Sequence, residues 1–356
     1  MKKNLRRWLW LVACVVVVVL AFHNLRRGPE WQSFSWERTW LSLKDANLAY
    51  LLAAVAATCT SYLVRAYRWR FFLDPIKKGS LWTLFVGQVL GFAAIYLLGR
   101  PGEFVRPAYI AKKEDVTFTS QLAIWLLERI YDMVFIILLL SIALAFGPLR
   151  PETAHARHVV RATRWVGLAI LLVAIMIVVV LVIFRLRAEE MRTGSPPFLR
   201  RLSERNQQRV EHFLQSFVDG LEVIENWRDF LYSVASTAVL WFFNATVFWL
   251  ALHSLGGDLA KLSWLAAALA LVFSILGMLA QLPGIGGGFQ VVAIYVLTGF
   301  FRIKPEVATG AAILLWLVIT VPCVLLGLLM LVHEGLTFKR LETIAVTDRP
   351  APAGKA

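Results

Sequence analysis

The sequence predicts an all-α polytopic membrane protein with about six transmembrane helices and two re-entrant hairpins broken at proline and glycine. Of its 356 residues, 59% are hydrophobic and 17% are charged, well below the roughly 25% charged residues of soluble domains. Hydrophobic residues also form long runs, such as 8–24 and 121–147, and about 20 apolar residues cross a bilayer. A soluble enzyme is therefore excluded.

The distribution of Lys and Arg indicates which hydrophobic segments cross the membrane. If every segment crossed, more basic residues would lie outside than in the cytoplasm, against the positive-inside rule. If 81–111 and 264–301 are instead re-entrant hairpins, the bias reverses and both termini are cytoplasmic. The candidate segments are 8–24, 47–64, 81–98, 121–147, 165–184, 230–255, 264–282, 289–301 and 309–332.

Both expected hairpins contain a natural break in the helix, at 99–102 and at 283–288. Proline cannot continue a helix, and glycine admits sharp backbone turns. Broken backbone at membrane depth survives where protein or a water-filled cavity covers it. Because one hairpin would enter from each side, the pair suggests an inverted repeat of the kind found in transporters.

The chain divides into a membrane domain, residues 1–335, and a cytoplasmic tail, residues 336–356, that is partly disordered for lack of apolar residues. Within the first, 185–229 forms a basic amphipathic cytoplasmic loop that lies on an anionic leaflet or packs under the bundle as a connector. The net charge of +14 fits topology and anionic lipid better than nucleic acid.

The first polar cluster surrounds the end of the second segment. Arg68 and Arg70 are interpreted as anchors that reach the membrane interface beside Trp69. Arg65 lies deeper in the hydrophobic run, where its guanidinium could hold a lipid phosphate through two hydrogen bonds.

The second cluster is at the tip of the first hairpin and contains Arg100, Glu103 and Arg106. Glu103 and Arg106 are three residues apart on an expected helix, so they could pair with each other. Unpaired charges at membrane depth cost several kcal/mol and usually face a cavity. The alternative is an ordinary cytoplasmic loop with surface charges.

The third cluster, Glu128, Arg129 and Asp132, lies in segment 121–147 at or one turn inside the edge of the hydrocarbon. Glu128 and Asp132 share a helical face and repel each other unless an arginine neutralises them. They could serve substrate binding, or form a purely structural ion-pair network.

The fourth cluster is the glycine-rich tip of the second hairpin. A helix that starts near residue 289 would aim its free amides at this turn, which favours an anion such as phosphate. Close helix packing or a hinge is the alternative. The candidate residues are Pro283, Gly284, Gly286, Gly287, Gly288 and Gln290.

In this order and spacing, the clusters resemble the lysylphosphatidylglycerol synthase transmembrane family, the flippase-like membrane region also found in multiple peptide resistance factors. The resemblance covers roughly residues 5–335 and depends on Arg65 with 69–70, 99–103 with Arg106, 128–132, and 283–288. Pro101 departs from it, since many relatives have an aliphatic residue there.

The resemblance implies movement of a lipid or lipid-linked headgroup between leaflets of a cytoplasmic membrane, with an anionic phospholipid or polyprenyl-linked lipid as the ligand. The family's synthase activity belongs to a separate soluble domain after the membrane region. Because the sequence also shows no nucleophile, metal or cofactor motif, we expect a protein that is not an enzyme. The alternative is a non-transporting scaffold that docks envelope-lipid or glycolipid biosynthesis enzymes through 185–229.

Overall fold

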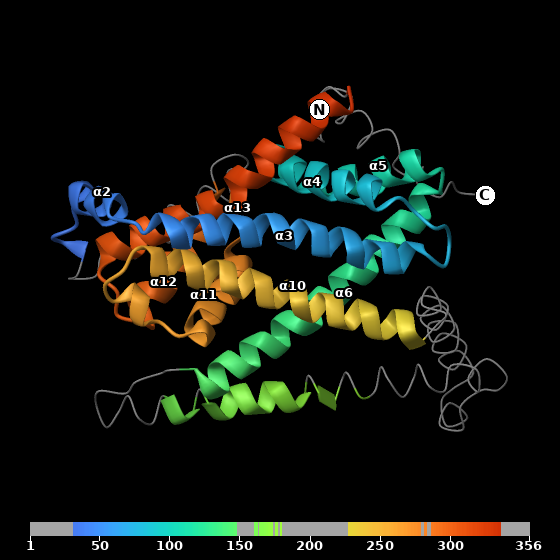
Figure 1. Ribbon diagram of the computed structural model, residues 1–356. Coiled ribbons are helices and arrows are strands. Elements are labelled where there is room, and N and C mark those ends of the chain that lie inside the picture. The colour runs from blue at the N-terminus through green and yellow to red at the C-terminus, as the bar shows by residue number, and fades with distance from the viewer. Residues whose placement is uncertain are drawn as a thin grey trace, which may run out of the picture.

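The computed structural model describes residues 31–147, most of 160–179, 227–278, 281–282 and 286–335. The described elements are helices apart from one short antiparallel ribbon (Figure 1). In chain order they are α2 (Trp36–Lys44), α3 (Leu48–Leu73), α4 (Leu81–Leu98), η2 (Arg100–Phe104), α5 (Val105–Glu114), α6 (Phe118–Phe146), α10 (Trp227–Ser254), η4 (Leu259–Lys261), α11 (Trp264–Gly277), β1 (Gln281–Leu282), β2 (Gly286–Gly287), α12 (Gly288–Gly299) and α13 (Pro305–His333).

The expected all-α membrane architecture is confirmed. Among the described residues, 5 helices are long and apolar enough to cross a membrane, namely α3, α4, α6, α10 and α13. Segment 8–24, the loop 185–226 and the tail 336–356 lie outside the described residues. Helix α3 continues to Leu73, well past the expected end at residue 64, and in this extension Arg68 and Trp69 are covered by other helices rather than by water.

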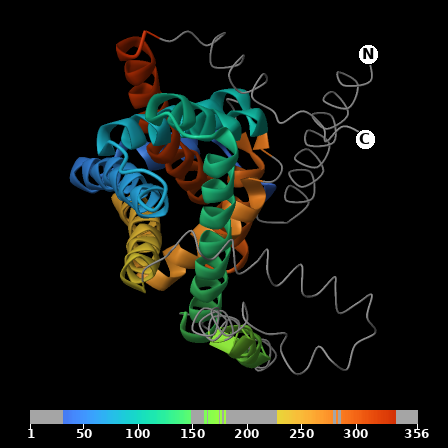
Figure 2. The same ribbon diagram turned by 90° about the vertical axis from the view of Figure 1, so that its right-hand side faces the viewer.

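Helices α3 and α10 lie side by side along much of their length, and α6 crosses next to them (Figures 1 and 2). Helix α13 packs against α4 and α3. At one end α13 is joined to α2 by an ion pair between Arg38 and Glu306 at 3.4 Å. At the other end Lys113 of α5 lies 2.6 Å from Glu334, and this hydrogen bond holds the pKa of Glu334 below its usual value.

The first expected hairpin is present as α4, η2 and α5. Helix α4 ends at Gly99, whose φ is 72°, and the chain folds back so tightly that a Cβ on Gly102 would lie 2.3 Å from the carbonyl carbon of Ala94. Only glycine fits this approach. Since α4 alone is long and apolar enough to cross, its treatment as half of a re-entrant element stays a prediction.

The second expected hairpin is present as α11 and α12, which pack against each other. They have 14 and 12 residues, fewer than the roughly 20 needed to span. The ribbon of β1 and β2 joins them, with Gln281 opposite Gly287. That this pair returns to its own side of the membrane stays a prediction, as does the inverted repeat.

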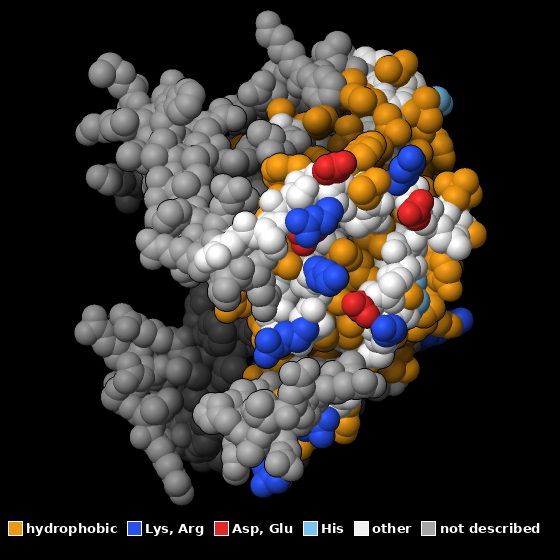
Figure 3. Space-filling model, turned by 90° about the vertical axis from the view of Figure 1, so that its left-hand side faces the viewer, with side chains coloured by type: hydrophobic (Ala, Val, Ile, Leu, Met, Phe, Trp, Pro, Cys, Tyr) orange, Lys and Arg blue, Asp and Glu red, His pale blue; other side chains and the backbone are white. Residues whose placement is uncertain are grey.

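The outer surface of the bundle suits a hydrocarbon environment. Large hydrophobic side chains on the spans are exposed, among them Leu52, Met133, Leu325 and Leu329. Figure 3 views the end at which α2 lies, where Lys, Arg, Asp and Glu gather amid hydrophobic side chains. This separation of apolar flanks and polar ends is the pattern of a membrane protein.

We expect the close approach of α13 and α4 at Gly327 to be sensitive to side-chain size. A Cβ on Gly327 would lie 2.3 Å from Cβ of Ala93, so Gly327→Leu should separate these helices and cost about 1–3 kcal/mol. Thermal unfolding in detergent measures this loss. The control Gly299→Leu adds the same side chain where nothing lies within 4 Å; equal melting temperatures for the two variants would contradict the packing.

Candidate functional site

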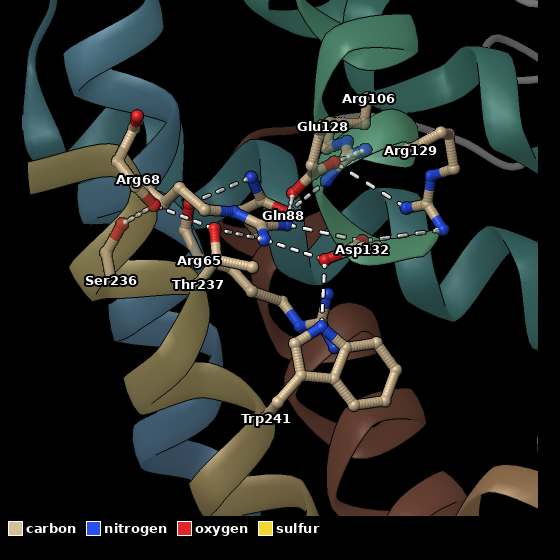
Figure 4. A network of polar contacts seen from close by, with 11 residues as sticks. Arg65, Arg68, Gln88, Arg106, Glu128, Arg129, Asp132, Ser236, Thr237 and Trp241 are labelled. Carbon is tan, nitrogen blue, oxygen red and sulfur yellow. Dashed lines mark hydrogen bonds and ion pairs between the residues drawn. The ribbon is translucent and has the colours of Figure 1, made fainter. Parts of the chain in front are cut away.

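A buried arginine of α3, Arg68, lies at the centre of an ionic network (Figure 4). Its Nη1 donates hydrogen bonds to Oδ1 of Asp132 at 2.7 Å and to Oγ1 of Thr237 at 3.2 Å. Its Nη2 donates to Oε1 of Glu128. The Arg68 side chain is 0% exposed. The hydrogen-bond partners of its guanidinium are therefore not solvent but two carboxylates from α6 and a hydroxyl from α10.

The second arginine of the network, Arg106, comes from α5 of the first hairpin. Its Nη2 donates to Oε2 of Glu128, and its Nη1 donates to Oε1 of Gln88 at 2.6 Å. The guanidinium carbon lies 4.3 Å from the ring centre of Trp69, a cation–π geometry. Arg106 therefore pairs with Glu128 rather than with Glu103, and the two oxygens of one buried carboxylate bind two arginines.

Arg129 completes the network at a more open position. Its Nη2 lies 3.6 Å from Oε2 of Glu128, and its Nη1 lies 3.9 Å from Oδ2 of Asp132. Its side chain is 39% exposed. Asp132 also accepts a hydrogen bond from Nε1 of Trp241 at 3.3 Å. The i, i+4 carboxylates of α6 are thus neutralised by arginines, as their spacing predicted.

The structure corrects the interpretation of Arg68 and Trp69 as interfacial anchors. Both side chains are fully buried, and Nε1 of Trp69 donates to Oε1 of Gln121 at 3.0 Å. Arg70 does fit that interpretation, since its side chain is 40% exposed and lies 3.7 Å from Asp74. The signal was present in the sequence: Thr58, Ser61, Arg65 and Arg68 recur every three or four residues, which marks one helical face.

A cavity of about 270 Å³ lies beside the network. At one end it is lined by Arg65, Glu103, Arg129 and Asp132. The guanidinium carbon of Arg65 lies 4.7 Å from the ring centre of Phe92, and no described side chain pairs with Arg65 or Glu103 in an ion pair. The other lining residues are mainly aromatic, aliphatic or neutral polar, namely Thr58, Ser61, Tyr62, Phe92, Ile95, Tyr96, Trp125, Ile136, Trp241, Asn244, Val247, Phe248, Leu271, Ile275, Met278, Phe289, Trp316, Ile319 and Thr320.

The charged candidates from three of the sequence clusters therefore converge. Arg65, Glu103, Arg129 and Asp132 line the cavity, while Arg106 and Glu128 lie behind them in the network. Arg100 belongs to η2, and its side chain lies outside the described residues. Sequence reasoning missed Arg68, Gln88, Thr237 and Trp241, which join the network from α3, α4 and α10.

The glycine-rich tip is arranged differently from the expected anion site. Gly287 has a φ of 95° and precedes α12, and its amide donates to Oε1 of Gln290 at 2.6 Å. Gln290 thus caps its own helix. Gly286 and Gly288 belong to β2 and α12, and Pro283 and Gly284 lie outside the described residues. The cavity wall receives Phe289 from this region.

Comparison with known families agrees with this arrangement. A family model described as the lysylphosphatidylglycerol synthase TM region matches residues 7–327. The chain belongs to this family. No curated protein matches the chain. Membership in the lysylphosphatidylglycerol synthase TM family places it among membrane proteins of lipid-related processes, and the match includes every charged residue of the network and the cavity.

Within the described residues, no group of three or more His, Cys, Asp or Glu side chains could hold a metal ion. The charged groups of this family member's site are guanidinium and carboxylate groups, which bind and orient ions through charge-assisted hydrogen bonds.

We expect Arg68→Ala to destabilise the protein by about 3–5 kcal/mol, since it leaves two buried carboxylates without their main partner. The matched control is Arg70→Ala, two residues along the same helix, which removes one half-exposed ion pair worth at most about 1 kcal/mol. Thermal unfolding in detergent compares them. Similar losses for both variants would show that the Arg68 network contributes little.

Proposed function

We propose that the protein translocates a lipid or lipid-linked headgroup between the leaflets of the cytoplasmic membrane. The observation that carries this proposal is the two-sided character of the cavity, which joins an ionic end to aromatic and aliphatic walls inside a bundle of membrane-spanning helices. A phospholipid has the same two-sided chemistry.

The charges of the ionic end, counted together with the network behind it, favour an anionic group. Four arginines, at 65, 68, 106 and 129, accompany three carboxylates, at 103, 128 and 132, so one positive charge is in excess. Arginine holds phosphate oxygens through two parallel hydrogen bonds. Arg65 and Arg129 are the arginines that line the cavity, and they are the proposed phosphate ligands.

The size of the cavity supports a headgroup-shelter mechanism. About 270 Å³ far exceeds the roughly 10–15 Å³ that a cavity needs to hold one water molecule, so a polar headgroup has room there. In this mechanism the acyl chains stay in the bilayer while the headgroup passes between helices. Both hairpins contribute walls, through Tyr96 and Glu103 from the first and Leu271 and Phe289 from the second.

Leaflet exchange of a labelled anionic phospholipid in vesicles tests the proposal. Arg65→Gln and Arg129→Gln should each slow protein-dependent exchange at least tenfold, because a charge-assisted hydrogen bond contributes about 1.5–3 kcal/mol. Arg70→Gln is the control, since Arg70 lies outside the cavity. If vesicles that contain the unmodified protein exchange the lipid no faster than empty vesicles, intrinsic transport is contradicted and the non-transporting scaffold is favoured.

A further inference from the structure

The cavity has a second polar layer that the ionic end does not explain. The layer consists of Ser61 on α3, Asn244 on α10 and Trp316 on α13. Ser61 lies four residues before Arg65, and Asn244 lies three residues after Trp241. Trp316 lies four residues before Thr320. All line the cavity. Given the directions of α3, α10 and α13 in Figure 1, each step leads toward the end at which α2 lies. With a rise of 1.5 Å per residue, these steps of three or four residues correspond to about 4.5–6 Å along the helix axes.

The side chains of this neutral layer, Ser61, Asn244 and Trp316, offer both donors and acceptors. Nε1 of Trp316 is buried without a hydrogen-bond acceptor in the described structure, although a buried donor normally has one. The hydroxyl of Ser61 donates to the carbonyl oxygen of Thr58 at 2.7 Å, which leaves its oxygen free to accept. Asn244 supplies an amide with both functions. A ligand hydroxyl also donates and accepts, and so matches this set.

The charge balance limits what else the headgroup carries. The single excess positive charge of the ionic end is neutralised by one phosphodiester, which carries one negative charge. A phosphodiester group alone also fills only part of about 270 Å³, so room for a further uncharged group remains beside Trp241 and Trp316, whose rings offer flat apolar faces.

We propose that the ligand is a phosphodiester lipid with a ring polyol or sugar headgroup, whose phosphate binds Arg65 and Arg129 and whose hydroxyls bind Ser61, Asn244 and Trp316. This inference rests on the proposed function and specifies its substrate class. It separates the roles of two layers: the arginines select for phosphate, and the neutral layer selects among phospholipids by their headgroups.

The experiment compares leaflet exchange of four acyl-labelled lipids by the full chain in vesicles: phosphatidylinositol, phosphatidylglycerol, phosphatidic acid and phosphatidylethanolamine. Phosphatidylinositol should exchange fastest. Trp316→Phe keeps an aromatic ring but removes the donor, and should lower the rate ratio of phosphatidylinositol to phosphatidic acid roughly three- to tenfold, the effect of one neutral hydrogen bond. Asn244→Ala should lower the same ratio.

The control Trp82→Phe makes the same chemical change outside the cavity and should leave the ratio as in the unmodified protein. Equal rates for the four lipids, or a ratio unaffected by both cavity variants, would overturn the inference while leaving transport intact.

If no lipid exchanges, the inference is tested by binding of short-chain phosphatidylinositol and phosphatidylglycerol in detergent. Tighter binding of phosphatidylinositol that weakens in Trp316→Phe supports the inference. Equal binding of the two lipids overturns it. Equal binding of deacylated glycerophosphoinositol would identify a water-soluble ligand and overturn the lipid assignment.

Discussion

The buried carboxylate of Glu128, bound by Arg68 and Arg106 at once, is the interaction on which the arrangement of the bundle depends. Transfer of a lone charge into a low-dielectric interior costs several kcal/mol, and only close partners with good geometry offset that cost. Since these three residues come from α6, α3 and α5, any structure that separates these helices leaves a charge unpaired. The network therefore fixes the first hairpin against the long helices.

The same constraint produces the cavity. Glu128 pairs with Arg68 and Arg106 behind the cavity. The cavity itself is lined by Arg65, Arg129 and Glu103. Counted together, these groups and Asp132 carry one excess positive charge, so the interior holds a rigid ionic layer rather than a fully neutralised salt-bridge cluster. Preorganised charge of this kind binds an anion without first rearranging its own partners.

Close backbone contacts fold each hairpin tightly onto itself. Gly102 lets η2 return onto α4, and Gly277 lies against Gly288 so closely that a Cβ would be 2.3 Å from its carbonyl oxygen. The helix breaks were readable from proline and glycine positions, because the backbone limits of these residues are local. Their consequence, two hairpins whose side chains meet in one cavity, was not readable, because it depends on how helices dock.

Sequence analysis alone predicted the membrane class, the breaks at both hairpins and four of the long helices to within a few residues at most ends. It also predicted that Glu128 and Asp132 need neutralising partners. These features were predictable because hydropathy, helical spacing and the cost of a buried charge are local properties. Only the tertiary structure decided which arginines perform that neutralisation. Arg68 and Arg70 differ by two positions, yet one faces the bundle and the other faces away, because helix rotation is set by packing between segments 60 residues apart. The neutral layer beside Trp316 arises in the same way, from neighbours that lie close only after folding.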